Sequence, residues 1–258
     1  MSIPDVREHT KETTWVGKSI RRIEDPKFLR GKGGYIADRA IPGMMHIALV
    51  KSPYAHAVIK SIDTREARAL PGVVAIVTGT EAAELCDPLP DFGPDPSKHT
   101  WRVLAHEKVR YVGEGVAAVV AESRYIAEDA ASLVWVEYDE LPPIVDPEEA
   151  LKPGSPLVHD PLGTNVAYER TFLFGDVEAA FAEADLVVED RLHWGRSGSQ
   201  PIEPVGAIAS FDTGTGQMTI WENSLSFTSY LFMLAGTLKI PSNRLDVHPV
   251  PAGGSVGS

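Results

Sequence analysis

Five residues near the end of the sequence have types and spacing that could serve chemistry: Gly253-Gly254-Ser255-Val256-Gly257. The series fits G-x-S-x-G, in which a sharp strand-to-helix turn exposes a nucleophilic serine. That motif needs an acid and a histidine later in the chain, and nothing follows Ser258. Glycines also let the backbone approach a ligand, so that peptide N–H groups donate to an anion or to cofactor oxygens. A simple turn is the remaining interpretation.

The other polar residues form no comparable group. The eight histidines are scattered, and none forms H-E-x-x-H or a close pair suited to a metal, so no metal ligand is predicted. Cys86 is expected to be a buried or incidental thiol. Glu114 is expected to be a surface acid in a turn. Glu203 lies between Pro201 and Pro204, which fix the backbone around it, and is predicted to be a structural hydrogen-bond acceptor.

The composition limits the classes of function. A chain of 258 residues holds one large domain or two smaller ones, and 43% hydrophobic with 23% charged residues is ordinary for a globular protein. With 24 basic and 36 acidic residues the net charge is -12, which argues against a nucleic-acid-binding surface. The single cysteine excludes an internal disulfide and a Cys₄ zinc or Fe–S site. No apolar run reaches the roughly 18 residues of a membrane span. The first residues also contain no apolar stretch of the kind that a signal peptide has, so the chain is expected to be cytoplasmic.

The hydrophobic pattern predicts strands and helices that alternate through the first part of the chain. Strands are expected at 44–50, 55–63, 73–77, 108–112, 116–120 and 135–138. A helix is expected at 65–70 with Thr64 as its cap, another up to Leu85 with Thr80 as its cap, and a third from Ser123 onward. Residues 87–100 are expected to form a loop. The pattern favours one compact α/β or α+β unit.

The second part begins after a segment with six prolines among charges, 141–161, which is the best candidate for a linker. Beyond it the patterns predict an extended stretch at 166–174, a helix at 177–184 capped by Asp176, a strand at 186–189, a hairpin of 207–211 with 218–221, a helix at 226–239 and a strand at 245–247. A glycine-rich turn directly after a strand usually leads into a helix or approaches a ligand. This ending predicts a fragment, or one half of a split protein.

Nine motifs, in order and at familiar spacing, resemble the molybdenum-binding large subunit of the xanthine dehydrogenase, aldehyde oxidase and carbon monoxide dehydrogenase family. Six lie in the first part: Arg22-Ile23-Glu24-Asp25-Pro26, Gly33-Gly34-Tyr35-Ile36-Ala37-Asp38, Ser52-Pro53-Tyr54-Ala55-His56-Ala57, Leu70-Pro71-Gly72-Val73-Val74, Val109-Arg110-Tyr111-Val112-Gly113-Glu114 and Val136-Glu137-Tyr138. Three follow: Gly175-Asp176-Val177-Glu178-Ala179-Ala180-Phe181, Ile202-Glu203-Pro204 and the glycine series. Each motif alone is weak, but their succession from about Val16 to the end is specific.

The resemblance implies an α+β fold. An N-terminal arm (1–20) precedes an α/β hammerhead domain (21–141), a linker (142–164) and the beginning of a mixed α/β molybdopterin-binding domain (165–258). It implies molybdenum-molybdopterin, which bacterial members often carry as the cytosine dinucleotide. It also implies hydroxylation of an aldehyde, an N-heterocycle or a related small substrate with oxygen from water. The implied partners are the downstream half of the large subunit, a small Fe–S subunit and a medium FAD subunit.

The resemblance also assigns residues. The family's Gly-Gly-Gly-Phe-Gly loop, whose amides lie beside the metal's ligands, corresponds to Gly253, Gly254, Ser255, Val256 and Gly257. Serine replaces one glycine there, and valine replaces the phenylalanine. A family glutamine corresponds to Leu225, which cannot donate a hydrogen bond, unless Asn223 serves instead.

These departures motivate an alternative, a non-catalytic relative that acts as a scaffold or an interaction module. The family's catalytic glutamate lies further downstream. We therefore predict no catalytic residue on this chain.

Overall fold

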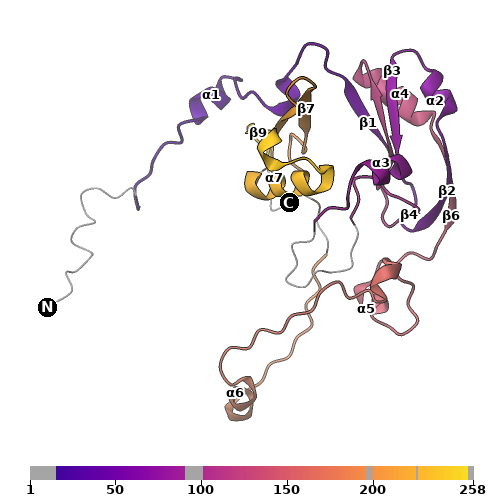
Figure 1. Cartoon of the computed structure of the whole chain (residues 1–258). Coiled ribbons are helices and arrows are strands. Elements are labelled where there is room, and N and C mark those ends of the chain that lie inside the picture. The colour runs from indigo at the N-terminus through magenta and orange to yellow at the C-terminus, as the bar shows by residue number, and fades with distance from the viewer. Residues whose placement is uncertain (1–15, 91–100, 196–197, 199, 225, 255–258) are drawn as a thin grey trace.

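The computed structural model describes residues 16–90, 101–195, 198, 200–224 and 226–254. Within these residues the strands form three sheets of three strands each (Figure 1). The first sheet has the order β1-β5-β3 and the second β4-β2-β6, and their neighbouring strands are antiparallel. The third has the order β7-β8-β9, with β8 and β9 parallel. The strands are β1 His46–Lys51, β2 Ala57–Asp63, β3 Val73–Thr78, β4 Lys108–Val109, β5 Gly115–Ala121, β6 Trp135–Glu140, β7 Ala207–Asp212, β8 Gln217–Glu222 and β9 Leu245–Pro249.

The main core lies between the first sheet and helix α4 (Arg124–Ser132). This helix packs on β1 and β5 through small residues, and Ala127 and Ala130 are fully buried. It begins at Ser123, whose hydroxyl accepts a hydrogen bond from the N–H of Ile126 at 3.3 Å. The predicted helix and its cap are therefore confirmed. The central strand β5 contributes a run of fully buried side chains because both of its faces are covered: Val116, Ala117, Val119 and Ala121.

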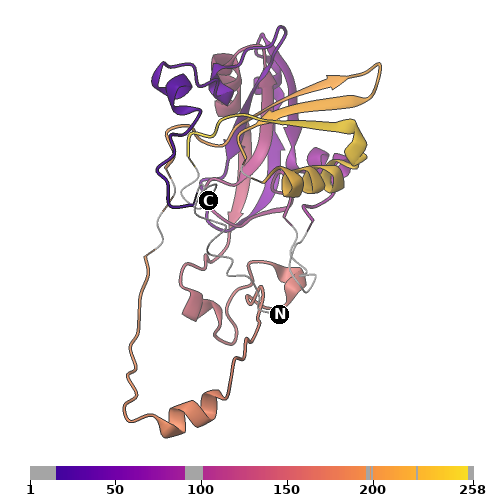
Figure 2. The same ribbon diagram turned by 90° about the vertical axis from the view of Figure 1, so that its left-hand side faces the viewer.

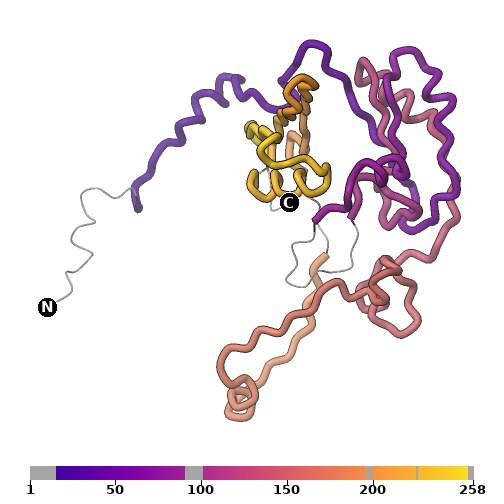
Figure 3. The backbone as a smooth tube through the Cα atoms, in the orientation of Figure 1, coloured from indigo at the N-terminus to yellow at the C-terminus, as the bar shows by residue number. Residues whose placement is uncertain are grey.

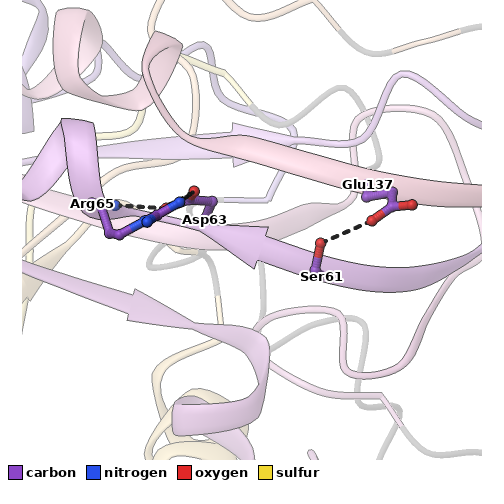
Figure 4. Close-up of polar contacts among 4 residues, drawn as sticks. All are labelled: Ser61, Asp63, Arg65 and Glu137. Carbon is purple, nitrogen blue, oxygen red and sulfur yellow. Dashed lines mark hydrogen bonds and ion pairs between the residues drawn. The ribbon is translucent and has the colours of Figure 1, made fainter.

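Helix α2 (Arg65–Ala69) has the predicted Thr64 at its N-cap position, but the side-chain contact with its first turn comes from Asp63. The Thr64 side chain makes no capping hydrogen bond. The Asp63 carboxylate instead accepts from the guanidinium of Arg65 and from the N–H of the same residue at 3.0 Å (Figure 4). These two contacts, the guanidinium first, lower the pKa of Asp63 to about 2. Figure 4 also shows the Ser61 hydroxyl donating to Glu137 at 3.2 Å, across the pair β2–β6.

Helix α3 (Gly79–Leu85) also has a different cap from the predicted one. Thr78 accepts from the N–H of Glu81, and the Glu81 carboxylate accepts in return from the Thr78 N–H at 2.7 Å. This reciprocal pair is a capping box, so the prediction of Thr80 as the cap is wrong. Gly79 suits the first turn because a Cβ there would lie 1.7 Å from the carbonyl oxygen of Ala105.

The proline-rich segment after β6 is folded against the second sheet. It contains α5 (Pro147–Ala150) and the 3₁₀ turn η2 (Asp160–Leu162). Lys108 on β4 donates to the carboxylate of Asp160 at 2.6 Å, and the Arg110 side chain donates to the carbonyl of Val158 at 3.2 Å. The predicted linker therefore makes defined contacts with β4 and with Arg110, which follows that strand.

The third sheet carries helix α7 (Phe227–Leu238), followed by η3 (Ser242–Arg244). The predicted hairpin, helix and last strand are all present, with shifted ends. Two contacts join α7 to the segment after α3. The N–H of Asp87 donates to the carbonyl of Thr237 at 2.8 Å, and Lys239 pairs with the Asp87 carboxylate at 2.8 Å.

Before the first sheet, the chain forms α1 (Asp25–Leu29) and the 3₁₀ turn η1 (Ile36–Asp38). The tube in Figure 3 shows this segment leading into β1.

Residues 166–194, which we call the α6 segment, extend away from the three sheets (Figures 1 and 2). Helix α6 (Val177–Glu183) begins as predicted at Asp176, whose carboxylate accepts from the N–H of Ala179 at 3.0 Å. The strand predicted at 186–189 is wrong for this structure, because no neighbouring strand pairs with it among the described residues.

Candidate cofactor-binding site

Three residues, Val250, Pro251 and Ala252, separate the end of β9 from the glycine series. Because β9 runs parallel to β8, the chain leaves both strands at the same edge of the third sheet. The N–H of Val250 donates to the carbonyl of Glu222 at 2.9 Å, and the Val250 side chain is buried. This contact fixes the direction in which residues 251–254 depart. Ser255, Val256 and Gly257 lie outside the described residues, as does Leu225.

The first two glycines occupy positions that a larger residue could not take unchanged. A Cβ on Gly253 would lie 2.4 Å from the Cβ of Glu203 and 2.7 Å from its backbone nitrogen. Gly254 has a φ of +145°, a conformation that is strained for residues with a side chain. Among the described residues, neither glycine N–H donates a hydrogen bond. Two peptide donors at this turn therefore have no partner among the described residues. The interpretation of the series as a loop that donates to an anion or to cofactor oxygens requires such donors.

Glu203 holds the glycine loop against the rest of the protein. One of its carboxylate oxygens accepts from the N–H of Ala37 in η1 at 3.1 Å, and the other accepts from the side-chain amide of Asn223 at 3.3 Å. The predicted role as a structural hydrogen-bond acceptor is confirmed. Residues that are far apart in the sequence thus meet at the Glu203 carboxylate, while the backbone and Cβ of Glu203 lie against Gly253.

Asn223 is buried, and its side chain serves the fold. Its oxygen accepts from the N–H of Gly206 at 3.0 Å, and its nitrogen donates to Glu203 and to the carbonyl of Pro204 at 3.0 Å. An amide nitrogen carries two hydrogens, so none remains for a ligand. Asn223 is therefore not a substitute for the family's glutamine.

Glu222 is a buried acid that belongs to none of the motifs singled out from the sequence. Only 2% of its surface is exposed. One carboxylate oxygen accepts from the N–H of Ser224, and the other has no hydrogen-bond partner among the described residues. Burial, and then the negative charge of Glu222, raise the pKa of Tyr230 on α7. A buried polar atom without a partner is uncommon, and it makes the end of β8, where the Glu222 carbonyl accepts from Val250, a ligand-site candidate.

The donors and the acceptor at this edge suit the chemistry of a pterin cofactor. The N–H groups of Gly253 and Gly254, which donate to none of the described residues, can donate to oxygen or sulfur atoms. The unpartnered Glu222 oxygen can accept from a ring N–H, which a pterin carries. The residues present therefore fit such a group.

Glu114 lies apart from this loop, and the expectation of a surface acid is wrong. Its side chain is half-buried and accepts from the N–H of Arg110 at 2.6 Å. Burial raises its pKa, although the N–H and the positive charge of Arg110 act in the opposite direction. Glu114 lines a cavity of about 160 Å³ with Trp101, Arg102, His106 and His159, among others. The cavity lies between β4 and the segment that contains η2.

Metal and membrane features can be judged for the part of the chain that the structure describes. In that part, no three side chains of His, Cys, Asp or Glu lie together as a metal site would require. None of its helices has the length and apolar character needed to cross a membrane. Cys86, the single thiol, is partly exposed and forms no disulfide.

Two family models match the chain in succession. Residues 30–142 match the aldehyde oxidase and xanthine dehydrogenase a/b hammerhead domain, and residues 158–258 match the molybdopterin cofactor-binding domain. The chain belongs to the aldehyde oxidase and xanthine dehydrogenase family. As a family member it has the expected fold class, a hammerhead domain of helices and sheets followed by a molybdopterin cofactor-binding domain.

Individual relatives agree with this family. The chain is 34% identical to the carbon monoxide dehydrogenase large chain of Afipia carboxidovorans over 99% of its own length and 33% of the relative. It is 35% identical to the nicotine 6-hydroxylase large subunit of Paenarthrobacter nicotinovorans over 94% of its length and 30% of the relative. Quinoline 2-oxidoreductase from Pseudomonas putida 86 superposes with a TM-score of 0.85 at 37% identity, covering 93% of this chain and 30% of that one. The chain thus spans about a third of the length of these family members.

Proposed function

We propose that this chain forms the hammerhead domain and one wall of the cofactor site in the large subunit of a molybdenum hydroxylase. The observation that carries the proposal is the glycine loop: Gly253 packs on Glu203 so closely that only glycine fits, and the N–H groups of Gly253 and Gly254 donate to none of the described residues. The three other residues of the glycine series, Ser255, Val256 and Gly257, are proposed to complete this wall together with Leu225.

In this proposal the chain's residues bind and orient the cofactor. The N–H groups of Gly253 and Gly254 hold it, Glu203 and Asn223 keep the loop in place, and the Glu222 oxygen accepts from a donor on it. The bound molybdenum-pterin group supplies the two-electron redox chemistry of oxidative hydroxylation with oxygen from water. The proposed substrate is an aldehyde, an N-heterocycle or a related small molecule. The cytosine dinucleotide form of the pterin belongs to the proposal as well.

The proposal assigns the remaining parts to other polypeptides. The rest of the large subunit supplies the general base and the opposite wall of the site. A small Fe–S subunit and a medium FAD subunit take up the electrons. Relatives of this chain are named as large chains or large subunits, which suits an assembly of this kind. We predict no catalytic residue among the side chains described here.

The test is to purify the chain with the rest of its subunit and measure molybdenum by mass spectrometry and pterin by fluorescence after oxidation. We expect about one metal and one pterin in each folded assembly, and dye reduction with an aldehyde or an N-heterocycle. A folded assembly without molybdenum would contradict the proposal. Bound cofactor without dye reduction of any such substrate would favour the non-catalytic scaffold instead.

A further inference from the structure

The cavity beside Glu114 lies where β4 meets the folded proline-rich segment. Lys108 of β4 and Asp160 of η2 form an ion pair at 2.6 Å that holds the two sides together. The Lys108 side chain is mostly buried, with 16% of it exposed. The space of about 160 Å³ is therefore bounded by elements whose relative position this contact fixes.

One positive charge in the lining of the cavity has no counterpart among the described residues. Arg102 lines the cavity and is half-buried, and its guanidinium has neither an acceptor nor an ion-pair partner there. Arg110, by contrast, donates through Nε to the carbonyl of Val158 and through Nη1 to that of Lys108. A charged group that is partly removed from water costs free energy unless it is paired. The Arg102 guanidinium is therefore suited to an anion.

The two carboxylates of the lining leave this charge available. Glu114 accepts from the N–H of Arg110, and burial raises its pKa, which favours the neutral form of the carboxyl. The Glu107 side chain is 81% exposed, so water screens its charge. Neither acid thus opposes an anion at Arg102 as strongly as a buried carboxylate would.

His106 adds a buried polar atom without a partner to the same lining. Its Nδ1 has no hydrogen-bond partner in the described part of the chain, while its Nε2 lies 3.4 Å from a carboxylate oxygen of Glu107. Glu107 has a φ of +65°, which is uncommon for a residue with a side chain, and its carbonyl accepts from the N–H of Ile59 at 2.7 Å. Unpaired buried polar atoms and strained backbone both occur preferentially at ligand sites. Here the two features are adjacent in the sequence.

The remaining walls of the cavity suit a flat ring. The rings of Trp101 and His159 have their centroids 5.8 Å apart, and Ala105 and Pro161 add apolar surface. A protein cavity of about 150 Å³ is large enough to hold benzene. The space of about 160 Å³ beside Arg102 therefore matches one aromatic ring that carries an anionic group.

We propose that this cavity binds a small aromatic carboxylate. The carboxylate pairs with the Arg102 guanidinium, the ring lies against Trp101, and Nδ1 of His106 offers a second polar contact. None of these residues belongs to the proposed cofactor wall, so the inference goes beyond the proposed function and does not depend on it.

The test is isothermal titration of the full chain with benzoate, benzamide and acetate. Benzamide keeps the ring of benzoate but has no charge, and acetate keeps the charge but has no ring. R102Q removes the positive charge from the cavity. R30Q is the matched control, because Arg30 is exposed and forms no ion pair among the described residues. Thermal unfolding checks that both variants fold.

We expect a dissociation constant of about 1 mM or lower for benzoate, which is within reach of a ligand with one ring. The constant should be at least about tenfold higher for benzamide, for acetate and for benzoate with R102Q, while R30Q matches the wild type. No binding of benzoate, or equal affinities of R102Q and R30Q for it, would overturn the inference. If R102Q does not fold, the unaltered chain still decides, because equal affinities for benzoate and benzamide would show that the charge plays no part.

Discussion

Replacing Gly253 by alanine tests the geometry of the glycine loop directly. The added Cβ would lie 2.4 Å from the Cβ, 2.7 Å from the nitrogen and 2.9 Å from the Cα of Glu203. None of these atoms is the flexible end of a side chain, so the backbone itself must move. Glu203 resists this movement through its bonds to Ala37 and Asn223, at 3.1 and 3.3 Å. Overpacking of this kind costs about 1–3 kcal/mol.

For a chain of this size, such a cost corresponds to a fall in Tm of roughly 2–12 °C. Differential scanning fluorimetry of the isolated chain measures it, with G195A as the control, because a Cβ on Gly195 meets nothing within 4 Å. In the assembled enzyme, G253A is also expected to lower the pterin content, since the displaced loop turns its N–H groups away. A G253A chain with the Tm of the wild type and of G195A would refute the close packing on which the site rests.

Three further predictions concern other parts of the fold. N223L leaves the Gly206 N–H, the Pro204 carbonyl and the Glu203 carboxylate without this partner, and we expect urea unfolding to show a loss on the order of 3 kcal/mol. Because the folded protein raises the pKa of Glu114, it favours the protonated form, so its stability relative to E114Q should rise as the pH falls from 7 to 4; a constant difference in Tm would contradict this. D63A should lower the Tm by more than T64A does, because Asp63 provides the capping contact of α2, and the reverse order would restore Thr64 as the cap.

The sequence predicted most of the regular elements correctly because their patterns are local. The β-branched run at Val73 and the alanines after Ser123 each determine their structure within a few residues. The caps were predicted less well. Helix α3 is capped by Thr78 rather than by the predicted Thr80. At α2, Thr64 holds the N-cap position but the side-chain contact comes from Asp63, and only the backbone conformation decides between such candidates.

The candidate site could be predicted only in part, because its parts meet through long-range contacts. The glycine series and the rigid Glu203 were visible in the sequence, since glycine and proline restrict or free the backbone in known ways. Asn223 gave no such signal: its role depends on Gly206, Pro204 and Glu203, residues that approach it only once β7 and β8 have paired. The buried Glu222 was equally invisible, because nothing local distinguishes it from an exposed acid at a strand end.

The error at residues 186–189 has a different cause and bears on function. The apolar, β-branched composition of this run predicts a strand. Composition indicates that a segment suits a sheet, but it does not show whether a neighbouring strand is present to pair with it. A strand satisfies its backbone only through a neighbour, and the described residues offer none beside the α6 segment. At the glycine loop, likewise, the N–H groups of Gly253 and Gly254 donate to none of the described residues, although Gly253 packs closely on Glu203. Both features lie in the part that matches the cofactor-binding domain, and neither has a hydrogen-bonding neighbour among the described residues.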